Sequence, residues 1–189
     1  MQQALSDYVK IYENHLPASV CKSACKNLEE SSWSEHKFYR SSDHQLVSFE
    51  KELSVSYQPI FESDAINKSI WYAIEKYILK DFANFSEWFN GWSGYSHVRF
   101  NRYDPETRMK LHCDHIHSLF DGERKGIPIL TLVGALNDDY EGGEFVLFGD
   151  QKVALPTGSI AVFPSNFLYP HEVKPVKSGV RYSFVSWAW

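Results

Sequence analysis

Hydrophobic and polar residues alternate with one period in the first half of the chain and with another in the second. Apolar residues recur every four positions within residues 17–31, which predicts a helix. These apolar residues are Val20, Ala24 and Leu28. A second helix is predicted after Ser63 and Asp64, which can cap its first turn. Its apolar stripe consists of Ile66, Ile70, Ala73, Ile74, Tyr77 and Ile78. We expect this stripe to pack against a sheet.

From Ser96 onward the apolar residues follow a period of two, which is typical of strands. Val98 and Phe100 alternate with polar neighbours, and residues 129–136 form a continuous apolar run that predicts a strand buried on both faces. Turn signals separate further short strands. They are Glu141-Gly142-Gly143 and Pro156-Thr157-Gly158. Many short strands after a helical block predict a mainly β protein with flanking helices, built as a double-sheet jelly roll.

Length and composition agree with one globular domain. A chain of 189 residues can bury one sizeable core, so we expect a single domain over residues 1–189. Helical support is expected mainly in residues 1–95 and the jelly-roll core mainly in residues 96–189. The content of 43% hydrophobic and 16% aromatic residues argues against a disordered chain.

Charge and cysteine usage narrow the possible partners and compartments. The net charge of -5 argues against nucleic-acid binding through a basic surface. No apolar run approaches the roughly 20 residues of a membrane span, so no membrane partner is expected. The odd set of Cys21, Cys25 and Cys113 shows no paired zinc spacing, and the first residues do not resemble a targeting segment. We therefore expect a reducing cytoplasmic environment.

A candidate metal site is formed by His112, Asp114 and His171. His112 and Asp114 are two residues apart, so in extended backbone their side chains point to the same face. Taken alone, this pair could equally be hydrogen-bonded partners on a surface. Two imidazoles and one carboxylate on one side of a metal leave its other positions open, which is the ligand set of non-haem Fe(II) oxygenases. Zinc also accepts such a set.

The last predicted strand carries a candidate anion-binding residue. Arg181 follows His171 by ten residues and begins an alternating run in which Ser183, Val185 and Trp187 share its side. A guanidinium on that side is expected to be buried, and a buried guanidinium requires an anion. Arginine can hold an acidic co-substrate through a two-pronged, charge-assisted contact.

The stretch from Ser96 to Trp189 resembles the Fe(II)/2-oxoglutarate-dependent oxygenases, and within them the prolyl 4-hydroxylase-like branch. The resemblance rests on the order and spacing of several segments, since a lone His-x-Asp would be weak evidence. These segments are His97–Tyr103, His112-x-Asp114, Leu136–Glu144, Pro156–Pro164, Pro170–Val173 and Arg181-Tyr182. The family implies a double-stranded β-helix core, which is the same architecture that the strand pattern predicts.

The resemblance also implies the metal and its co-substrate. It makes His112, Asp114 and His171 the ligands of Fe(II), with 2-oxoglutarate and O2 as co-substrates and ascorbate as a candidate reductant. In the family, the position of Arg181 holds the distal carboxylate of 2-oxoglutarate, and the position of Tyr103 assists it. An arginine at this spacing favours an iron oxygenase over a zinc protein. No catalytic residue is expected beyond the metal centre.

Two further positions receive roles from the resemblance. Thr131 is expected beside the same distal carboxylate, and Trp187 is expected to line the mouth of the substrate site. The loop from Cys113 to Lys125 is long enough to close over a peptide.

The expected reaction is hydroxylation of a prolyl residue in a peptide or protein, with release of succinate and CO2. A free amino acid or another small molecule is the alternative substrate. The acidic balance argues against an alkylated nucleobase, which would require a basic groove and a stacking platform. A third hypothesis is a non-catalytic, metal-binding jelly roll that recognises a partner, although such a scaffold would not need a clamp for a 2-oxo acid.

Overall fold

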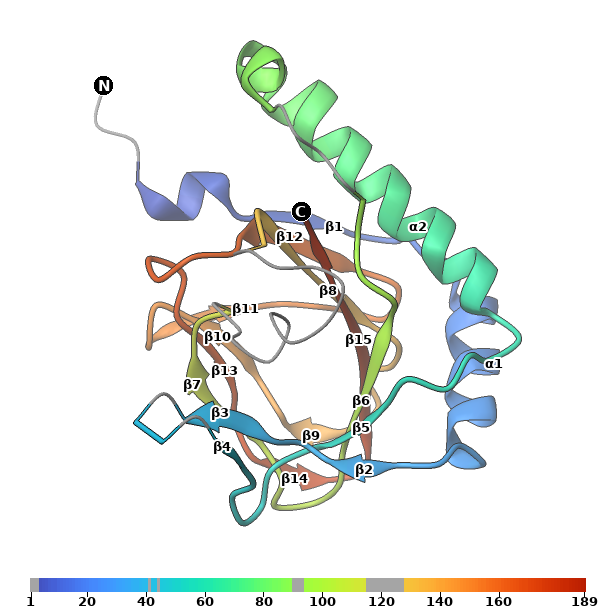
Figure 1. Ribbon diagram of the computed structural model, residues 1–189. Coiled ribbons are helices and arrows are strands. Elements are labelled where there is room, and N and C mark those ends of the chain that lie inside the picture. Colours follow the sequence, from blue (N-terminus) through green and yellow to red (C-terminus); the bar gives the residue numbers. More distant parts are fainter. Residues whose placement is uncertain (1–3, 41, 44, 90–93, 115–127) are drawn as a thin grey trace.

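Two main antiparallel sheets form the body of the protein in the computed structural model (Figure 1), which describes residues 4–40, 42–43, 45–89, 94–114 and 128–189. The strands of the larger sheet are, in order, β1 (Lys10–Tyr12), β12 (Ile160–Pro164), β8 (Leu130–Ala135), β15 (Arg181–Ala188), β6 (Arg99–Tyr103), β5 (Ser54–Ser56) and β2 (Ser34–Glu35). The strands of the smaller sheet are β11 (Gln151–Val153), β10 (Phe145–Leu147), β13 (His171–Val173) and β7 (Met109–His112). The predicted jelly roll with flanking helices is therefore confirmed.

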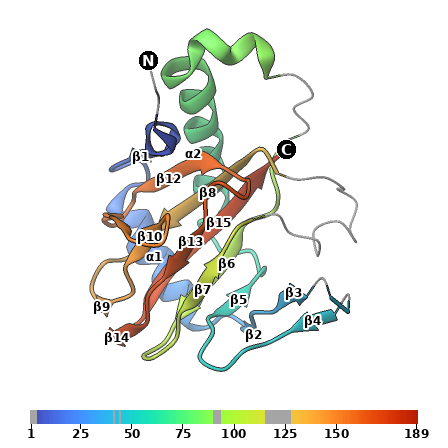
Figure 2. The same cartoon turned by 90° about the vertical axis from the view of Figure 1, so that its left-hand side faces the viewer.

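Two short strand pairs complete the described β structure. The pairs are β14 (Val176–Ser178) with β9 (Glu141–Gly142), and β3 (Phe38–Arg40) with β4 (Gln45–Val47). The β3–β4 hairpin lies away from the two long helices (Figure 2). It reaches the interior through Phe38, whose ring lies 6.0 Å from the ring of His112 at the end of β7.

The two long helices, α1 (Ala18–Glu29) and α2 (Ser63–Lys76), cover the outer face of the larger sheet. The other helical segments are the 3-10 helix η1 (Leu5–Tyr8), the π-helical turn η2 (Tyr77–Asp81) and the 3-10 helix η3 (Ala83–Trp88). The predicted stripe of the second helix packs in one core cluster with Phe100, Leu132 and Phe184 of the sheet, as expected. In the described part of the chain, no helix is both long and apolar enough to span a membrane.

The two faces of β15 point into two different cores. Tyr182 and Phe184 pack with the helices, whereas Val185 and Trp187 pack between the two sheets. The predicted sidedness of this strand is therefore correct. The inner core also contains Phe163 and side chains of both sheets, so the polar residues on the inner faces are enclosed as well.

The structure differs from the sequence predictions in the first half of the chain. Residues 1–95 supply strands β1 to β5 besides the helices. The sequence pattern did not reveal these strands, because strands of two or three residues are too short for a period of two to be recognised. Helix α2 has Glu62 at its N-cap, while the Ser63 hydroxyl accepts a hydrogen bond from the backbone N–H of Ile60. The predicted cap at Ser63 and Asp64 is thus wrong. Most of the predicted loop from Cys113 to Lys125 lies outside the described residues.

Candidate metal centre

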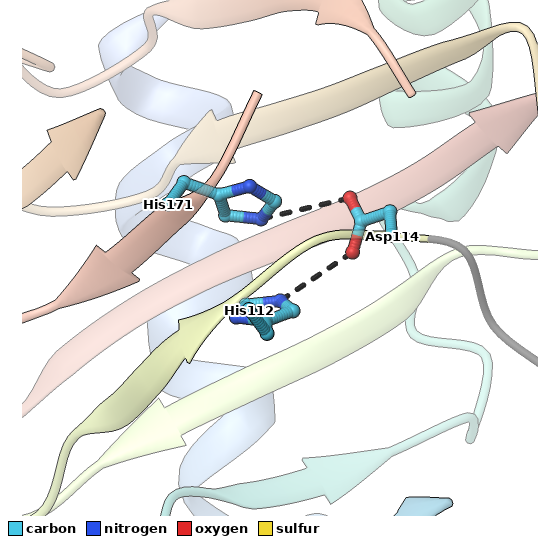
Figure 3. A group of neighbouring side chains, drawn as sticks. All are labelled: His112, Asp114 and His171. Atoms are coloured by element: carbon cyan, nitrogen blue, oxygen red, sulfur yellow. Dashed lines mark ion pairs between the residues drawn. The ribbon is translucent and has the colours of Figure 1, made fainter. Parts of the chain in front are cut away.

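Strands β7 and β13 bring three candidate ligands together at one end of the smaller sheet. His112 ends β7, His171 begins β13, and the two residues are register partners. Asp114 lies two residues beyond the end of β7, and the ligand atoms of the three side chains all lie within 4.8 Å of one another. Asp114 Oδ1 is 3.4 Å from His112 Nε2, and Oδ2 is 3.6 Å from His171 Nε2 (Figure 3).

Backbone carbonyls orient both imidazole rings. His112 Nδ1 lies 2.8 Å from the carbonyl oxygen of Lys110, and His171 Nδ1 lies 3.1 Å from that of Tyr169. Since a carbonyl oxygen only accepts, each Nδ1 carries the proton and donates it. In a neutral ring, the lone pair then resides on Nε2 and faces Asp114. This orientation by a hydrogen bond from the second ring nitrogen is typical of metal-binding histidines.

Burial and neighbouring groups set the charge of His171 and Asp114. Burial lowers the pKa of His171 to about 4, so its ring is neutral at pH 7. Burial alone would raise the pKa of Asp114, but the favourable interactions with His171 and His112 in their protonated forms and the hydrogen bond from Thr131 outweigh it and hold this pKa well below its usual range. The neutral imidazole of His171, the Nε2 of His112 and the Asp114 carboxylate converge on one point, and this arrangement fits a divalent cation such as Fe(II).

Thr131 lies at the metal end of the barrel, which corrects the position predicted for it. Its hydroxyl donates to Asp114 Oδ2 at 2.7 Å and contacts Ser165 Oγ at 2.9 Å. Thr131 is the register partner of Trp187, six residues beyond Arg181 on β15, so about 20 Å of strand separates it from Arg181. Thr131 thus orients a candidate metal ligand and does not lie beside the guanidinium.

We expect Thr131→Val to weaken divalent-metal binding about tenfold while leaving the fold intact. The substitution conserves shape but removes the donor that fixes the Asp114 carboxylate, and loss of such an outer contact typically costs at least this factor in metal affinity. Metal titration by calorimetry measures the effect. The control is Thr107→Val, because the Thr107 hydroxyl bonds only the nearby carbonyl of Asp104. Equal affinities of both variants and the parent would contradict this role.

Arg181 forms a second polar centre, at the start of β15. It is only 1% exposed, and it donates from Nε to the Tyr140 hydroxyl at 3.1 Å and from Nη1 to Ser183 Oγ at 3.0 Å. Among the described residues, no carboxylate forms an ion pair with it. A buried guanidinium whose described hydrogen-bond partners are hydroxyl groups is suited to an external carboxylate.

Tyr103, for which the resemblance implies a role beside Arg181, lies opposite it. The two residues are register partners on β6 and β15, and the guanidinium carbon lies 4.9 Å from the centre of the Tyr103 ring. Burial raises the pKa of Tyr103 in spite of the neighbouring positive charge, so its hydroxyl keeps its proton and remains a donor. This arrangement supports a shared role of the two side chains in binding an anion.

Tyr140 belongs to the same centre but was not identified from the sequence. It precedes a turn in which Gly142 and Gly143 both have positive φ angles. A Cβ atom at Gly143 would lie 3.2 Å from Arg181 Cδ and 3.1 Å from the Tyr140 ring, so the glycine lets the turn close tightly over the arginine. The Gly-Gly pair was recognised only as a turn signal, and it is also the signal for this contact.

Trp187 is an interior residue and not part of an open rim. It is 2% exposed, and its indole N–H has no hydrogen-bond partner among the described residues. The guanidinium carbon of Arg99 lies 5.0 Å from the centre of its ring. Trp187 was expected at the mouth of the substrate site, whereas the structure places it inside the barrel, at the metal end.

Comparison with curated proteins places the same segment in a known group. Residues 98–189 match the family model described as the 2OG-Fe(II) oxygenase superfamily. A PKHD-type hydroxylase of Stenotrophomonas maltophilia (strain R551-3) is 37% identical over 94 residues, which are 47% of this chain and 41% of the relative. A PKHD-type hydroxylase of Crocosphaera subtropica is 36% identical over 95 residues, 48% of this chain and 41% of the relative. The match thus spans about two fifths of these relatives.

Solved structures share the fold over nearly the whole chain. A viral collagen prolyl hydroxylase from Paramecium Bursaria Chlorella virus-1 superposes with a TM-score of 0.66 at 15% identity, over 96% of this chain and 94% of that one. A Pseudomonas putida prolyl-4-hydroxylase gives 0.64 at 19% identity, over 96% and 91%. A Trichoplax adhaerens prolyl hydroxylase, solved with a peptide fragment of hypoxia inducible factor, gives 0.67 at 16% identity, over 97% and 84%. Residues 98–189, just under half of this chain, thus match the 2OG-Fe(II) oxygenase superfamily.

Proposed function

We propose that this protein is an Fe(II)- and 2-oxoglutarate-dependent dioxygenase, in which His112, Asp114 and His171 hold the iron. The observation that carries the proposal is the convergence of their ligand atoms within 4.8 Å, with both imidazoles oriented by backbone carbonyls. When bound, Fe(II) and 2-oxoglutarate supply the oxidation of an unactivated C–H bond by O2, with release of succinate and CO2. Zinc would fit the same donors, but the family and Arg181 favour iron.

The chain's own side chains position the co-substrate. Arg181 binds the distal carboxylate of 2-oxoglutarate, and the hydroxyl groups of Tyr140 and Ser183 fix the guanidinium from two sides. Tyr103 contributes a neutral hydroxyl from the opposite strand. Two fixed ends therefore define the place of the co-substrate, with the metal at one end of the inner space and the arginine toward the other.

Apolar side chains of both sheets exclude water from the space around the metal ligands. The ring of His171 lies 5.2 Å from that of Phe163 and 5.8 Å from that of Phe145. Val173 and Val185 belong to the same buried cluster. These apolar side chains limit the access of water to the metal centre and so reduce competing reactions with solvent.

The substrate that we propose is a prolyl residue within a peptide or protein. The similarity to PKHD-type hydroxylases and the shared fold with prolyl hydroxylases support this class. The peptide bound to the Trichoplax adhaerens enzyme gives a precedent for a polypeptide substrate on this fold. Proline also has a fixed φ angle, so it loses little conformational entropy when it enters a buried slot.

Incubation with Fe(II), 2-oxoglutarate and a panel of substrates tests the proposal. The panel contains proline peptides, free proline and a methylated oligonucleotide, and succinate and product mass are followed together. We expect succinate formation coupled to the gain of one oxygen atom on the proline peptides. Faster turnover of free proline would replace the peptide with a small molecule, and oxidation of the oligonucleotide alone would refute the prolyl substrate. Absence of any Fe(II)-dependent succinate formation would support a non-catalytic protein.

A further inference from the structure

A second arginine is buried inside the barrel, and the proposed chemistry does not use it. Arg99 begins β6 and is 8% exposed. Its Nε donates to Asn101 Oδ1 at 3.1 Å, and its guanidinium lies over the ring of Trp187. Among the residues that the structure describes, no carboxylate pairs with Arg99. A buried guanidinium in such surroundings is costly unless an anion completes them.

The neighbouring side chain, Trp187, carries a buried donor without a described partner. The indole N–H of Trp187 is buried and has no partner among the described residues. Guanidinium and indole N–H groups are donors only, so the group that satisfies both must be an acceptor. A buried indole N–H without a partner, beside a buried guanidinium without an ion-pair partner among the described residues, points to a ligand that carries an anionic oxygen.

Strand register places these donors at the metal end of the barrel. Arg99 is the register partner of Val185, and Trp187 is the partner of Thr131, whose hydroxyl bonds Asp114. Four residues of β6, about 13 Å, separate Arg99 from Tyr103, which lies opposite Arg181. The donor pair formed by Arg99 and Trp187 is therefore distinct from the anion site at Arg181.

The positive charge of Arg99 also lowers the pKa of a histidine near the metal centre. Burial lowers the pKa of His36 to about 3, and the positive charge of Arg99 lowers it further than any other neighbour does. A positive charge at the metal end of the barrel would attract an anionic group toward the reacting carbon.

We propose that Arg99, together with the indole N–H of Trp187, binds a carboxylate of the prime substrate beside the carbon that is oxidised. 2-Oxoglutarate has two carboxylates, of which one goes to Arg181 and the other is required at the metal, so Arg99 takes a third. The inference rests on the proposed function and narrows its substrate to compounds that present a carboxylate next to the reacting residue. This carboxylate comes from an acidic neighbour in a polypeptide, or from the α-carboxylate of a terminal or free amino acid.

The experiment compares matched proline substrates that differ in their carboxylates. They are a neutral N-acetylated peptide amide, the same peptide with Asp or Glu beside the proline, a peptide ending in proline as its acid and as its amide, and free proline. We expect kcat/KM of the best carboxylate-bearing member to exceed that of its neutral counterpart about tenfold or more. The substrate with the highest kcat/KM identifies the source of the carboxylate. Equal rates for neutral and anionic members, or turnover of none of them, overturn the inference.

Variants then show whether Arg99 is the recognition group. Arg99→Gln is expected to raise the KM for the preferred substrate about tenfold or more, with partial rescue in Arg99→Lys, whereas the KM for the co-substrate changes less than about twofold. Trp187→Phe removes the indole N–H while keeping a ring, and it should give a smaller increase. Calorimetry of the same substrate with protein loaded with Mn(II) and 2-oxoglutarate provides a readout besides activity.

The matched control is Arg102→Gln, three residues along the same strand. Arg102 pairs with Asp104 at 2.9 Å on the other face of β6, and its side chain is 31% exposed, so its loss should leave both Michaelis constants unchanged. A tenfold rise in the KM for the co-substrate in Arg99→Gln would assign Arg99 to 2-oxoglutarate binding and overturn the inference. Absence of Fe(II)-dependent succinate formation in the parent contradicts the proposed function itself, and the inference falls with it.

Discussion

Replacing Asp114 with alanine should abolish divalent-metal binding and 2-oxoglutarate turnover while leaving the fold intact. Asp114 is the only anionic group in the candidate ligand set and is 3% exposed, so its loss leaves this set without a negative charge. The two remaining imidazoles bind a hard divalent cation weakly by themselves. Metal content, succinate formation and circular dichroism measure the three parts of this expectation.

Two further variants separate charge from structural damage. Asp114→Asn keeps the size of the side chain and can still accept from Thr131, yet we expect it to lose the metal as well. Asp104→Ala removes a carboxylate whose ion pair with Arg102 is partly exposed, and it should retain both metal and activity. Full activity in Asp114→Ala would remove this residue from the ligand set and with it the proposed centre.

Much of the fold and of the candidate metal centre could be predicted because the relevant signals are local. Every residue of β8 is buried, as its continuous apolar run predicted. His112 and Asp114 are two residues apart in extended backbone, so sequence spacing alone aligns them. Their meeting with His171 depends on the pairing of β7 with β13, and only the resemblance to a family could predict this pairing.

Arg99 shows where the sequence pattern stops being informative. The alternation of Val98 and Phe100 with polar neighbours suggests one buried and one solvated face. In the structure, both faces of β6 are buried, because helices cover the side of Phe100 and the inner core covers the side of Tyr103. Alternation does not distinguish a polar face in solvent from one that lines a binding site, so Arg99 could not be identified as an interior residue.

Thr131 and Tyr140 were misjudged or missed for a related reason. The hydroxyl of Thr131 donates a hydrogen bond to Asp114, which is 17 residues away in the sequence, and that contact depends on tertiary structure. The contact of Tyr140 with Arg181 spans 41 residues and depends on the turn at Gly142 and Gly143. A sequence pattern reports which face a residue occupies, but not which partner it meets there.

The second large effect is expected for Arg181→Ala. This substitution should weaken 2-oxoglutarate binding and raise the co-substrate KM about tenfold or more. A charge-assisted hydrogen bond contributes roughly 1.5–3 kcal/mol, and about 1.4 kcal/mol corresponds to a factor of ten in affinity. The guanidinium is already fixed by Tyr140 and Ser183, so little conformational entropy is lost when the carboxylate binds. Steady-state kinetics at varied 2-oxoglutarate, with calorimetric titration of the Mn(II)-loaded protein, measure the change.

Conservative changes around Arg181 distinguish a positioning network from a single charge. Tyr140→Phe removes the hydroxyl that accepts from Nε, and Tyr103→Phe removes the donor on the opposite strand, so each should raise the co-substrate KM by less than Arg181→Ala does. Arg102→Ala removes an arginine from the outer face of the neighbouring strand and should leave 2-oxoglutarate binding unchanged. If Arg181→Ala binds 2-oxoglutarate as tightly as the parent, the distal carboxylate lies elsewhere, and the buried guanidinium would then need another anion.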